Sequence, residues 1–279
     1  MNAFKMIHHV DRRTLEWMYR RYEPVFILST GRSGSKLIVE LLGLSPAVNA
    51  FHEPRPTLQV FSDFAYHHQA QDNSLTKMID AARMEMVLET LIKGKVFVES
   101  NQCLTFFAPA IAALFRSAKF IHLVRHPGDF LASAARKGWY VNDSIWEAGR
   151  PTSAETGLWR KWDQMQKLAW LWAATNAYVE DFKKNLGKRR VLTIRLEDLV
   201  LGHEGVKSVF AFSGAGRVPW AEVERIQKTR INELQIFPDE PPNMRKNPDF
   251  PAYGEWPDAQ KRWFRERVGT LAALYGYEI

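Results

Sequence analysis

A chain of 279 residues that is 46% hydrophobic and 25% charged is long and apolar enough to bury a sizeable core, which excludes a disordered or fibrous protein. The formal net charge of +7 favours anionic partners, but the lysines and arginines are spread along the chain without a basic arm, so we expect no nucleic-acid partner. Cys103 is the only cysteine, which excludes an intramolecular disulfide and a multi-cysteine zinc site.

The apolar segments of the sequence are short. None reaches the roughly 18 residues of a membrane-spanning helix, and the first residues lack the apolar run of a signal peptide. A single free cysteine also suits a reducing compartment. We therefore expect a cytoplasmic protein without a membrane span.

Short apolar runs rich in β-forming residues alternate with stretches of helical periodicity along most of the chain. After an N-terminal helical extension at residues 1–24, the predicted strands cover residues 25–30, 95–99, 119–124 and 190–195. The predicted helices begin at residue 37 and cover residues 75–93, 105–117, 128–137, 158–184 and 258–275. Residues 237–257 are rich in proline and predict a long surface loop, of a length that often forms a lid. The alternation predicts one α/β domain over residues 1–279, with three layers around a central parallel sheet.

A turn of small residues joins the first predicted strand to the first helix, and it reads Thr30-Gly31-Arg32-Ser33-Gly34-Ser35-Lys36. Such a turn directs backbone N–H groups at an anion held at the helix N-terminus, although an ordinary strand-to-helix turn can have the same composition. It is not a Walker A motif, because Leu37 stands where a hydroxyl that holds magnesium is required. We therefore expect Arg32 and Lys36 to neutralise the anion in place of a metal.

An arginine and a serine mark a second candidate anion site. Arg125 follows the apolar run 119–124, Pro127 suits the first turn of the next helix, and Ser133 lies about two helical turns farther on. Arg125 is suited to a phosphate, while an ion pair with a carboxylate such as Asp129 is the alternative.

Together and in this order, the two segments resemble motifs of the PAPS-dependent sulfotransferase family, where PAPS is 3′-phosphoadenosine 5′-phosphosulfate. Residues 191–199, which read Val-Leu-Thr-Ile-Arg-Leu-Glu-Asp-Leu, and residues 274–277 are similar to further segments of the family. The resemblance runs from residue 25 to the end, and it is greater to the bacterial and carbohydrate-type branch than to the cytosolic branch. It implies a P-loop NTPase-like fold, PAPS as donor, and adenosine 3′,5′-bisphosphate as product.

The resemblance also implies roles for individual residues. Arg32 matches the basic residue beside the bridging oxygen of the donor, and Arg125 with Ser133 matches the pair that binds the 3′-phosphate. The cradle around the 5′-phosphosulfate consists of Ser33, Gly34, Ser35 and Lys36.

Two further donor contacts match the family pattern only in part. Leu37 stands where many members have a tryptophan that stacks on adenine, so the adenine contacts stay open. Arg245 and Lys246, in the proline-rich loop, resemble a basic segment that closes over the 3′-phosphate, but the family's full Arg-Lys-Gly pattern is absent.

Sulfuryl transfer requires a base that takes the proton of the acceptor. Glu53 matches a Glu-Pro element near the acceptor in carbohydrate-type and bacterial members, and it is our first candidate, since a partly dehydrated cleft can raise the pKa of a carboxylate toward neutrality. Glu99 is the rival, because it lies near the position of the histidine base of the cytosolic branch, where this chain has Asn101. His52 and His126 stay open as bases. The histidine doublets lack a set of metal partners, so we expect no metal site.

The sequence thus predicts a metal-independent enzyme that moves the sulfuryl group from PAPS to a hydroxyl or amine of a carbohydrate or small natural product. The aromatic segment 139–159 and residues 61–68 are the expected walls of the acceptor site. Two alternatives stay open, namely a nucleotide-dependent kinase or ATPase of the same architecture and a non-catalytic nucleotide-binding protein.

Overall fold

A five-stranded sheet forms the centre of the protein, in a computed structural model that describes residues 11–68, 73–141, 147–228 and 249–279. The strands are β1 (Val25–Leu28), β2 (Val48–His52), β3 (Val96–Ser100), β4 (Lys119–Val124) and β5 (Val191–Arg195). They lie in the order β2-β3-β1-β4-β5, and every pair of neighbours is parallel. Parallel strands need crossover connections, and helices provide them on both faces of the sheet. The predicted three-layer α/β fold is therefore confirmed.

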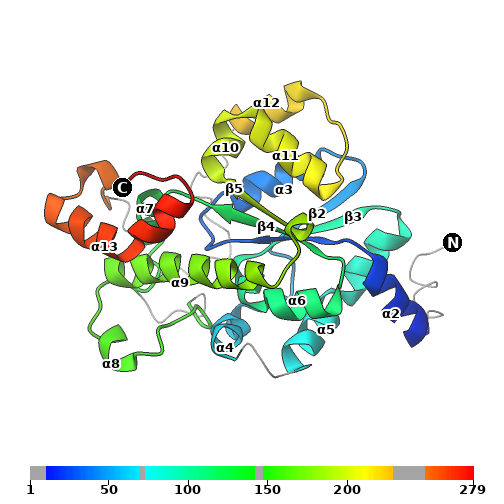
Figure 1. Ribbon diagram of the computed structural model, residues 1–279, viewed down its shortest axis with the longest axis horizontal. Helices are drawn as coiled ribbons and strands as arrows, with labels where there is room; N and C mark the ends of the chain where they lie inside the picture. The colour runs from blue at the N-terminus through cyan, green and yellow to red at the C-terminus, as the bar shows by residue number, and fades with distance from the viewer. Residues whose placement is uncertain (1–10, 69–72, 142–146, 229–248) are drawn as a thin grey trace.

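Two groups of helices cover the two faces of the sheet (Figure 1). Above it in this view lie α3 (Ser35–Gly43), α10 (Leu196–Leu201), α11 (His203–Ser213) and α12 (Trp220–Lys228). Below it lie α4 (Ser62–His67), α5 (Asn73–Ile92), α6 (Ala108–Leu114) and α9 (Gln164–Lys184). Toward one end are α7 (Pro127–Arg136), α8 (Thr156–Trp159) and α13 (Asp258–Leu274), and toward the other is α2 (Arg12–Arg21). Short 3₁₀ helices are η1 (Gln59–Phe61), η2 (Gln102–Phe107), η3 (Lys188–Arg190) and η4 (Tyr253–Glu255).

The side chains of each strand point alternately to the two faces, which gives each layer of helices its own core. Phe26, Phe97 and Phe120 pack with side chains of α5, α6 and α9 on one face. Ile27 and Val98 pack with side chains of α3, α11 and α12 on the other. Because both faces are covered, the inner strands β1 and β4 are buried almost throughout, and this continuous apolar signal is what made them predictable.

The structure corrects three of the predicted elements. β2 lies where no strand was predicted, because it is an edge strand of largely half-buried side chains and lacks an apolar run. The helix expected over residues 105–117 begins as η2 and continues as α6. The single helix expected over residues 158–184 is wrong, since Asp163 starts α9 afresh with a capping box: its Oδ1 accepts from the Gln166 amide at 2.8 Å, and Gln166 Oε1 accepts from the Asp163 amide at 3.0 Å.

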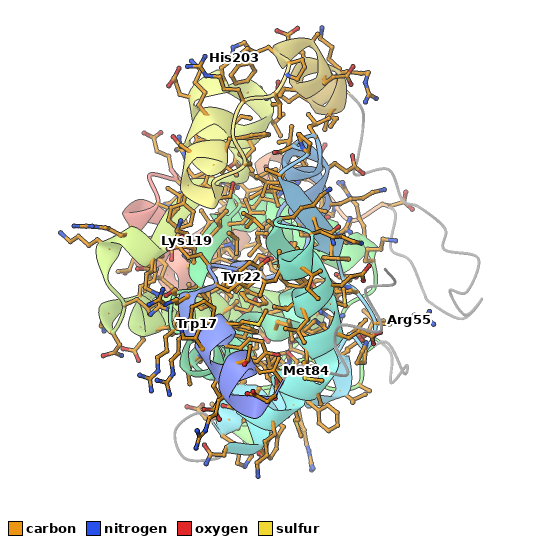
Figure 2. All side chains as sticks on the ribbon, turned by 90° about the vertical axis from the view of Figure 1, so that its right-hand side faces the viewer. Trp17, Tyr22, Arg55, Met84, Lys119 and His203 are labelled. Atoms are coloured by element: carbon orange, nitrogen blue, oxygen red, sulfur yellow. The ribbon has the colours of Figure 1, made fainter. Side chains whose placement is uncertain are left out.

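The segment before β1 packs on the sheet, whereas the described segment after α12 packs on α7 and α9. Tyr22, which follows α2, accepts a hydrogen bond from the Phe97 amide at 2.6 Å and donates one to the Lys95 carbonyl at 2.8 Å (Figure 2). In the proline-rich loop, residues 237–248 lie outside the described residues. The described part contains η4, where the ring of Tyr253 lies 5.4 Å from that of His126 between centroids. The lid therefore stays a prediction.

Candidate active site

The turn after β1 leads directly into α3 and forms the floor of the candidate site. Its backbone enters the left-handed region at Gly31, Arg32 and Gly34, with φ values of +76°, +52° and +88°. The buried hydroxyl of Ser33 pins the turn, since it bonds to Thr30 Oγ1 at 2.8 Å and donates to the Gly31 carbonyl at 2.9 Å. The Ile38 amide donates to the Gly34 carbonyl at 3.1 Å, and the amides before it in the first turn of α3 are those that a helix N-terminus offers to an anion.

The two glycines of the turn are required by conformation and by space. A Cβ at Gly34 would lie 2.3 Å from Leu196 Cδ1, and a Cβ at Gly31 would lie 1.4 Å from Gln102 Oε1. A larger residue at either position would displace the neighbours that hold the turn. The turn is therefore closely packed against η2 and α10 at its two glycines.

Three of the predicted donor-binding residues meet beside this turn. Arg32 Nε donates to Oγ of Ser133 on α7 at 3.1 Å, and Nη1 of Arg125, which follows β4, donates to the Arg32 carbonyl at 2.7 Å. β1 and β4 are neighbours in the sheet, so residues 93 and 101 positions apart in sequence are brought together. Two arginines that converge on one helix N-terminus form a cationic site suited to phosphate groups.

A hydrogen-bond network between α10 and the C-terminal segment lies next to Arg125 in the chain. Glu197 accepts a hydrogen bond from the His126 amide at 3.1 Å through Oε1 and one from the Tyr277 hydroxyl at 2.7 Å through Oε2. Burial lowers the pKa of Arg125, and Asp129 and Glu197 act in the opposite direction. Within the described residues its side-chain hydrogen bond goes to Arg32 rather than to Asp129. The two later segments of the family resemblance thus meet at Glu197, next to Arg125, whose role in binding an anion stays a prediction.

The remaining cradle residues lie on the first turn of α3. Ser35 Oγ is 3.1 Å from Nε2 of His52, and Lys36 Nζ is 3.7 Å from Glu40 Oε1. Protein atoms around the His52 ring displace water and lower its pKa, while Glu53 raises it and Lys36 lowers it further. The lowered pKa favours the neutral form of the imidazole. Sequence reasoning left His52 open, and the structure brings it to the site.

The side chain of Leu37 is part of the core. The side chain is 6% exposed and packs in the core between α3 and the sheet. A helix whose inner face covers a sheet turns this position inward. The contact of Leu37 with the donor stays a prediction, and the burial of its side chain argues against it.

Glu53 follows β2 and is exposed. Its amide donates to the Ser100 carbonyl at 2.9 Å, and its φ is +46°. Residues other than glycine rarely adopt this conformation, and where they do the strain is often part of a functional site. In the part of the chain that is described, Glu53 shares this feature with Arg32, Leu58 and Tyr140. Two of the three residues that the sequence predicts to be catalytic, Arg32 and Glu53, thus have left-handed backbones, and Glu99 does not.

Glu99 is in a different environment and is not placed to act as a base. It is 1% exposed, and Arg83 of α5 donates to its Oε2 from Nε at 2.6 Å and to its Oε1 from Nη2 at 2.8 Å. Asn101 Nδ2 lies 3.3 Å from Oε1. Burial raises the pKa of Glu99, and the hydrogen bond from Arg83 lowers it. The rival prediction is corrected, because both carboxylate oxygens are bound inside the protein and out of reach of an acceptor.

A small cavity lies beside the turn, between the end of β1, η2 and the segment 149–151. It has a volume of about 30 Å³ and is lined by Ser29, Thr30, Gln102 and Cys103, among others, which is room for a water molecule but not for an acceptor. Burial raises the pKa of Cys103 to about 12, and Glu53 acts in the same direction. The thiol therefore stays protonated and is not a nucleophile.

Other predictions concern residues or features away from this geometry. Arg245 and Lys246 lie outside the described residues. Over the described ranges there is no group of three or more His, Cys, Asp or Glu residues that could hold a metal ion. None of the helices described there combines the length and apolarity needed to cross a membrane.

The family follows from a comparison with protein-family models. The model of the sulfotransferase family matches residues 24–215, a range that includes the turn after β1, Arg125 and Ser133. The chain belongs to the sulfotransferase family. No curated protein sequence matches it.

Solved sulfotransferase structures are similar to this chain in fold. The sulfotransferase domain from the curacin biosynthetic pathway is 16% identical with a TM-score of 0.59, and the match covers 93% of this chain and 99% of that one. The sulfotransferase domain from the Synechococcus PCC 7002 olefin synthase is 17% identical with a TM-score of 0.56, over 93% and 97% of the two chains. A sulfotransferase from Alicyclobacillus acidocaldarius is 16% identical with a TM-score of 0.51, over 92% and 97%. At these identities the likeness concerns the fold alone.

Proposed function

We propose that this member of the sulfotransferase family uses PAPS as its donor and transfers the sulfuryl group to a hydroxyl or amine of a small acceptor. The observation that carries the proposal is the meeting of Arg32, Arg125 and Ser133 beside the N-terminus of α3. An anion with two separate charged groups, such as a nucleotide with a 5′-phosphosulfate and a 3′-phosphate, suits a site whose cations come from two neighbouring strands.

The residues of the site have distinct roles in this proposal. The backbone amides from Ser33 to Lys36 hold the 5′-phosphosulfate, and Arg125 with Ser133 holds the 3′-phosphate. PAPS, when bound, supplies a sulfuryl group attached to a phosphate that can leave. Arg32 is positioned to stabilise negative charge that grows on that phosphate, and preorganised donors of this kind contribute about 3 kcal/mol each to catalysis.

The base that takes the proton of the acceptor is Glu53, which is exposed at the carboxyl end of β2, on the same edge of the sheet as the turn. His52 is the second candidate, since its ring lies against Ser35 and its pKa is lowered. Separate Glu53→Gln and His52→Gln variants distinguish the two, because loss of the base lowers turnover by about a hundredfold or more, whereas loss of a neighbour does not.

The acceptor site extends from Glu53 toward η1 and α4. Val60, Phe61 and Phe64 are exposed there, and Arg150 lies 3.8 Å from the centroid of the Trp139 ring. Aromatic and cationic groups of this kind are suited to a carbohydrate or a small natural product. We further propose that residues 1–279 act as one domain, with the segment 237–257 as a lid and Arg245 and Lys246 as further contacts of the 3′-phosphate.

A transfer assay tests the proposal. The purified protein is incubated with PAPS labelled in its sulfur, a panel of hydroxyl- and amine-bearing acceptors, and EDTA. We expect labelled product and adenosine 3′,5′-bisphosphate, with activity undiminished by EDTA. Activity that uses ATP and requires magnesium would instead indicate a kinase or ATPase. Stabilisation by adenosine 3′,5′-bisphosphate without transfer or hydrolysis of PAPS would indicate a non-catalytic binding protein.

A further inference from the structure

A fully buried arginine lies behind the loop that contains Glu53. Arg83 of α5 is 0% exposed, and its charge is matched by Glu99 at the end of β3. Replacing a buried ion pair by apolar side chains of similar volume is often neutral or stabilising, so the presence of the pair is weak grounds for a role in stability. Its hydrogen bonds indicate what else it does.

The guanidinium of Arg83 also binds the backbone of the loop that follows β2. Its Nη1 donates to the Pro56 carbonyl at 2.9 Å and to the Ala82 carbonyl at 2.9 Å, and its Nη2 lies 3.4 Å from the Pro54 carbonyl. With the two bonds to Glu99, the donors of this guanidinium are fully used. Arg83 therefore links α5 to both β3 and the loop through the hydrogen bonds of one side chain.

The composition of the loop explains why a multi-donor side chain is needed there. Pro54 and Pro56 have no N–H, so this stretch cannot be held by regular backbone pairing and must be held through its carbonyl groups. Asn101 adds a contact, since its Nδ2 donates to the Thr57 carbonyl at 3.2 Å. The exposed Arg55 lies at the edge of the molecule in Figure 2, so the loop is fixed from its inner side.

We propose that Arg83, Glu99 and Asn101 form a clamp that positions Glu53 for proton transfer. The proposal rests on the proposed function of Glu53, which directly precedes Pro54 and has a left-handed backbone at φ +46°. Such a conformation persists only where the surroundings over-determine it. The clamp restrains the loop through the carbonyl groups of Pro54, Pro56 and Thr57, and the Glu53 amide is bound separately to the Ser100 carbonyl. Arg83, Glu99 and Asn101 are positioning residues and do not touch the substrates.

The test removes the clamp without leaving a buried charge. In the double variant Arg83→Met/Glu99→Leu, both members of the ion pair become apolar, so we expect a melting temperature close to that of the wild type. Hydrogen exchange at the amide of Glu53, which donates to the Ser100 carbonyl at 2.9 Å, should become faster. With PAPS labelled in its sulfur and the acceptor panel, kcat should fall about tenfold or more while the KM for PAPS stays unchanged, because only the base is displaced.

Two comparisons make the result specific. In a Glu53→Gln background the double variant should cause no further loss, since a residue that acts through Glu53 has no effect once the carboxylate is gone. Arg190→Met is the matched control, because Arg190 also binds backbone carbonyls, of Ala118 and Phe115, but at the opposite edge of the sheet. It should leave kcat and the exchange of the loop unchanged.

The clamp is refuted if the folded double variant has wild-type exchange in the loop, or if it lowers kcat by the same factor in the Glu53→Gln background. Should the double variant not fold, Asn101→Ser takes its place, because serine keeps the cap of η2 but does not reach Thr57. Faster exchange and a smaller loss of kcat are then expected, and wild-type values for both would overturn the proposal. Wild-type turnover by Glu53→Gln itself would contradict the proposed base instead, and the exchange measurement would still report on the clamp.

Discussion

Gly34→Ala perturbs the turn after β1 at the residue that leads into α3. Gly34 has a φ of +88°, and a Cβ there would lie 2.3 Å from Leu196 Cδ1. Leu196 is buried in the core between the sheet and the helices above it, so its side chain has little room to move. The substitution therefore combines a conformational penalty with a steric one.

The two penalties can be given magnitudes. A left-handed backbone costs an alanine about 1–2 kcal/mol, and overpacking of a core costs about 1–3 kcal/mol. The free energy of unfolding should fall by about 2–5 kcal/mol if the two add. The amides of the turn should also move, so stabilisation by adenosine 3′,5′-bisphosphate should weaken.

Urea denaturation with and without adenosine 3′,5′-bisphosphate measures both effects. Gly43→Ala is the matched control at the other end of α3, where a Cβ would lie 4.0 Å from Ala50 Cβ in ordinary contact. Alanine favours a helix over glycine by about 0.5–1 kcal/mol, so this control should be neutral or slightly stabilising. If Gly34→Ala were as stable as the wild type and bound the nucleotide equally well, the reasoning about the turn would be refuted.

Three further predictions concern charged and titrating groups. In calorimetric titration, Arg125→Met should weaken the affinity for adenosine 3′,5′-bisphosphate by about ten- to a hundredfold, which is the contribution of a charged hydrogen bond. Arg189→Met, at an exposed position, makes the same change in net charge and should have little effect. Equal losses of affinity in the two variants would contradict a specific contact. Arg32→Ala should lower the turnover of labelled PAPS by about a hundredfold and affect nucleotide binding less, and wild-type turnover would exclude its proposed role. Burial lowers the pKa of His122 below its ordinary 6.5, and its Nε2 lies 2.9 Å from Asn176 Oδ1. Below about pH 6.5, His122 is therefore protonated in the unfolded chain and still neutral in the folded protein. The free energy of unfolding, measured by urea titration, should therefore fall as the pH is lowered from about 6.5 to about 5. His122→Asn should make the free energy of unfolding less dependent on pH in this range. The same pH dependence in the variant and the wild type would contradict the role of His122.

The parts of the fold that were predictable from the sequence are those with continuous local signals. β1 and β4 are buried on both faces and appear as apolar runs, and the turn after β1 has a distinctive composition. β2 gave no such signal, because an edge strand that is half-buried has mixed side chains. The break before α9 was visible only as a capping residue, Asp163, followed by Gln166.

The residues of the candidate site were predictable from the sequence where a motif identifies them, and less so where the packing of distant segments determines whether a residue is accessible. Arg32, Arg125 and Ser133 were found from the order of two motifs, and the structure places them in contact. Glu53 follows β2 and Glu99 lies near the end of β3, and no local sequence pattern indicates that a buried arginine binds one of the two carboxylates. That information is in the packing of α5 against β3, between residues 16 positions apart.

A crystal structure with adenosine 3′,5′-bisphosphate would test the central claim most directly. We predict the 5′-phosphate on the backbone amides at the start of α3 and the 3′-phosphate on the side chains of Arg125 and Ser133. A nucleotide bound elsewhere, such as in the open groove between α11 and the segment 214–220, would contradict the account.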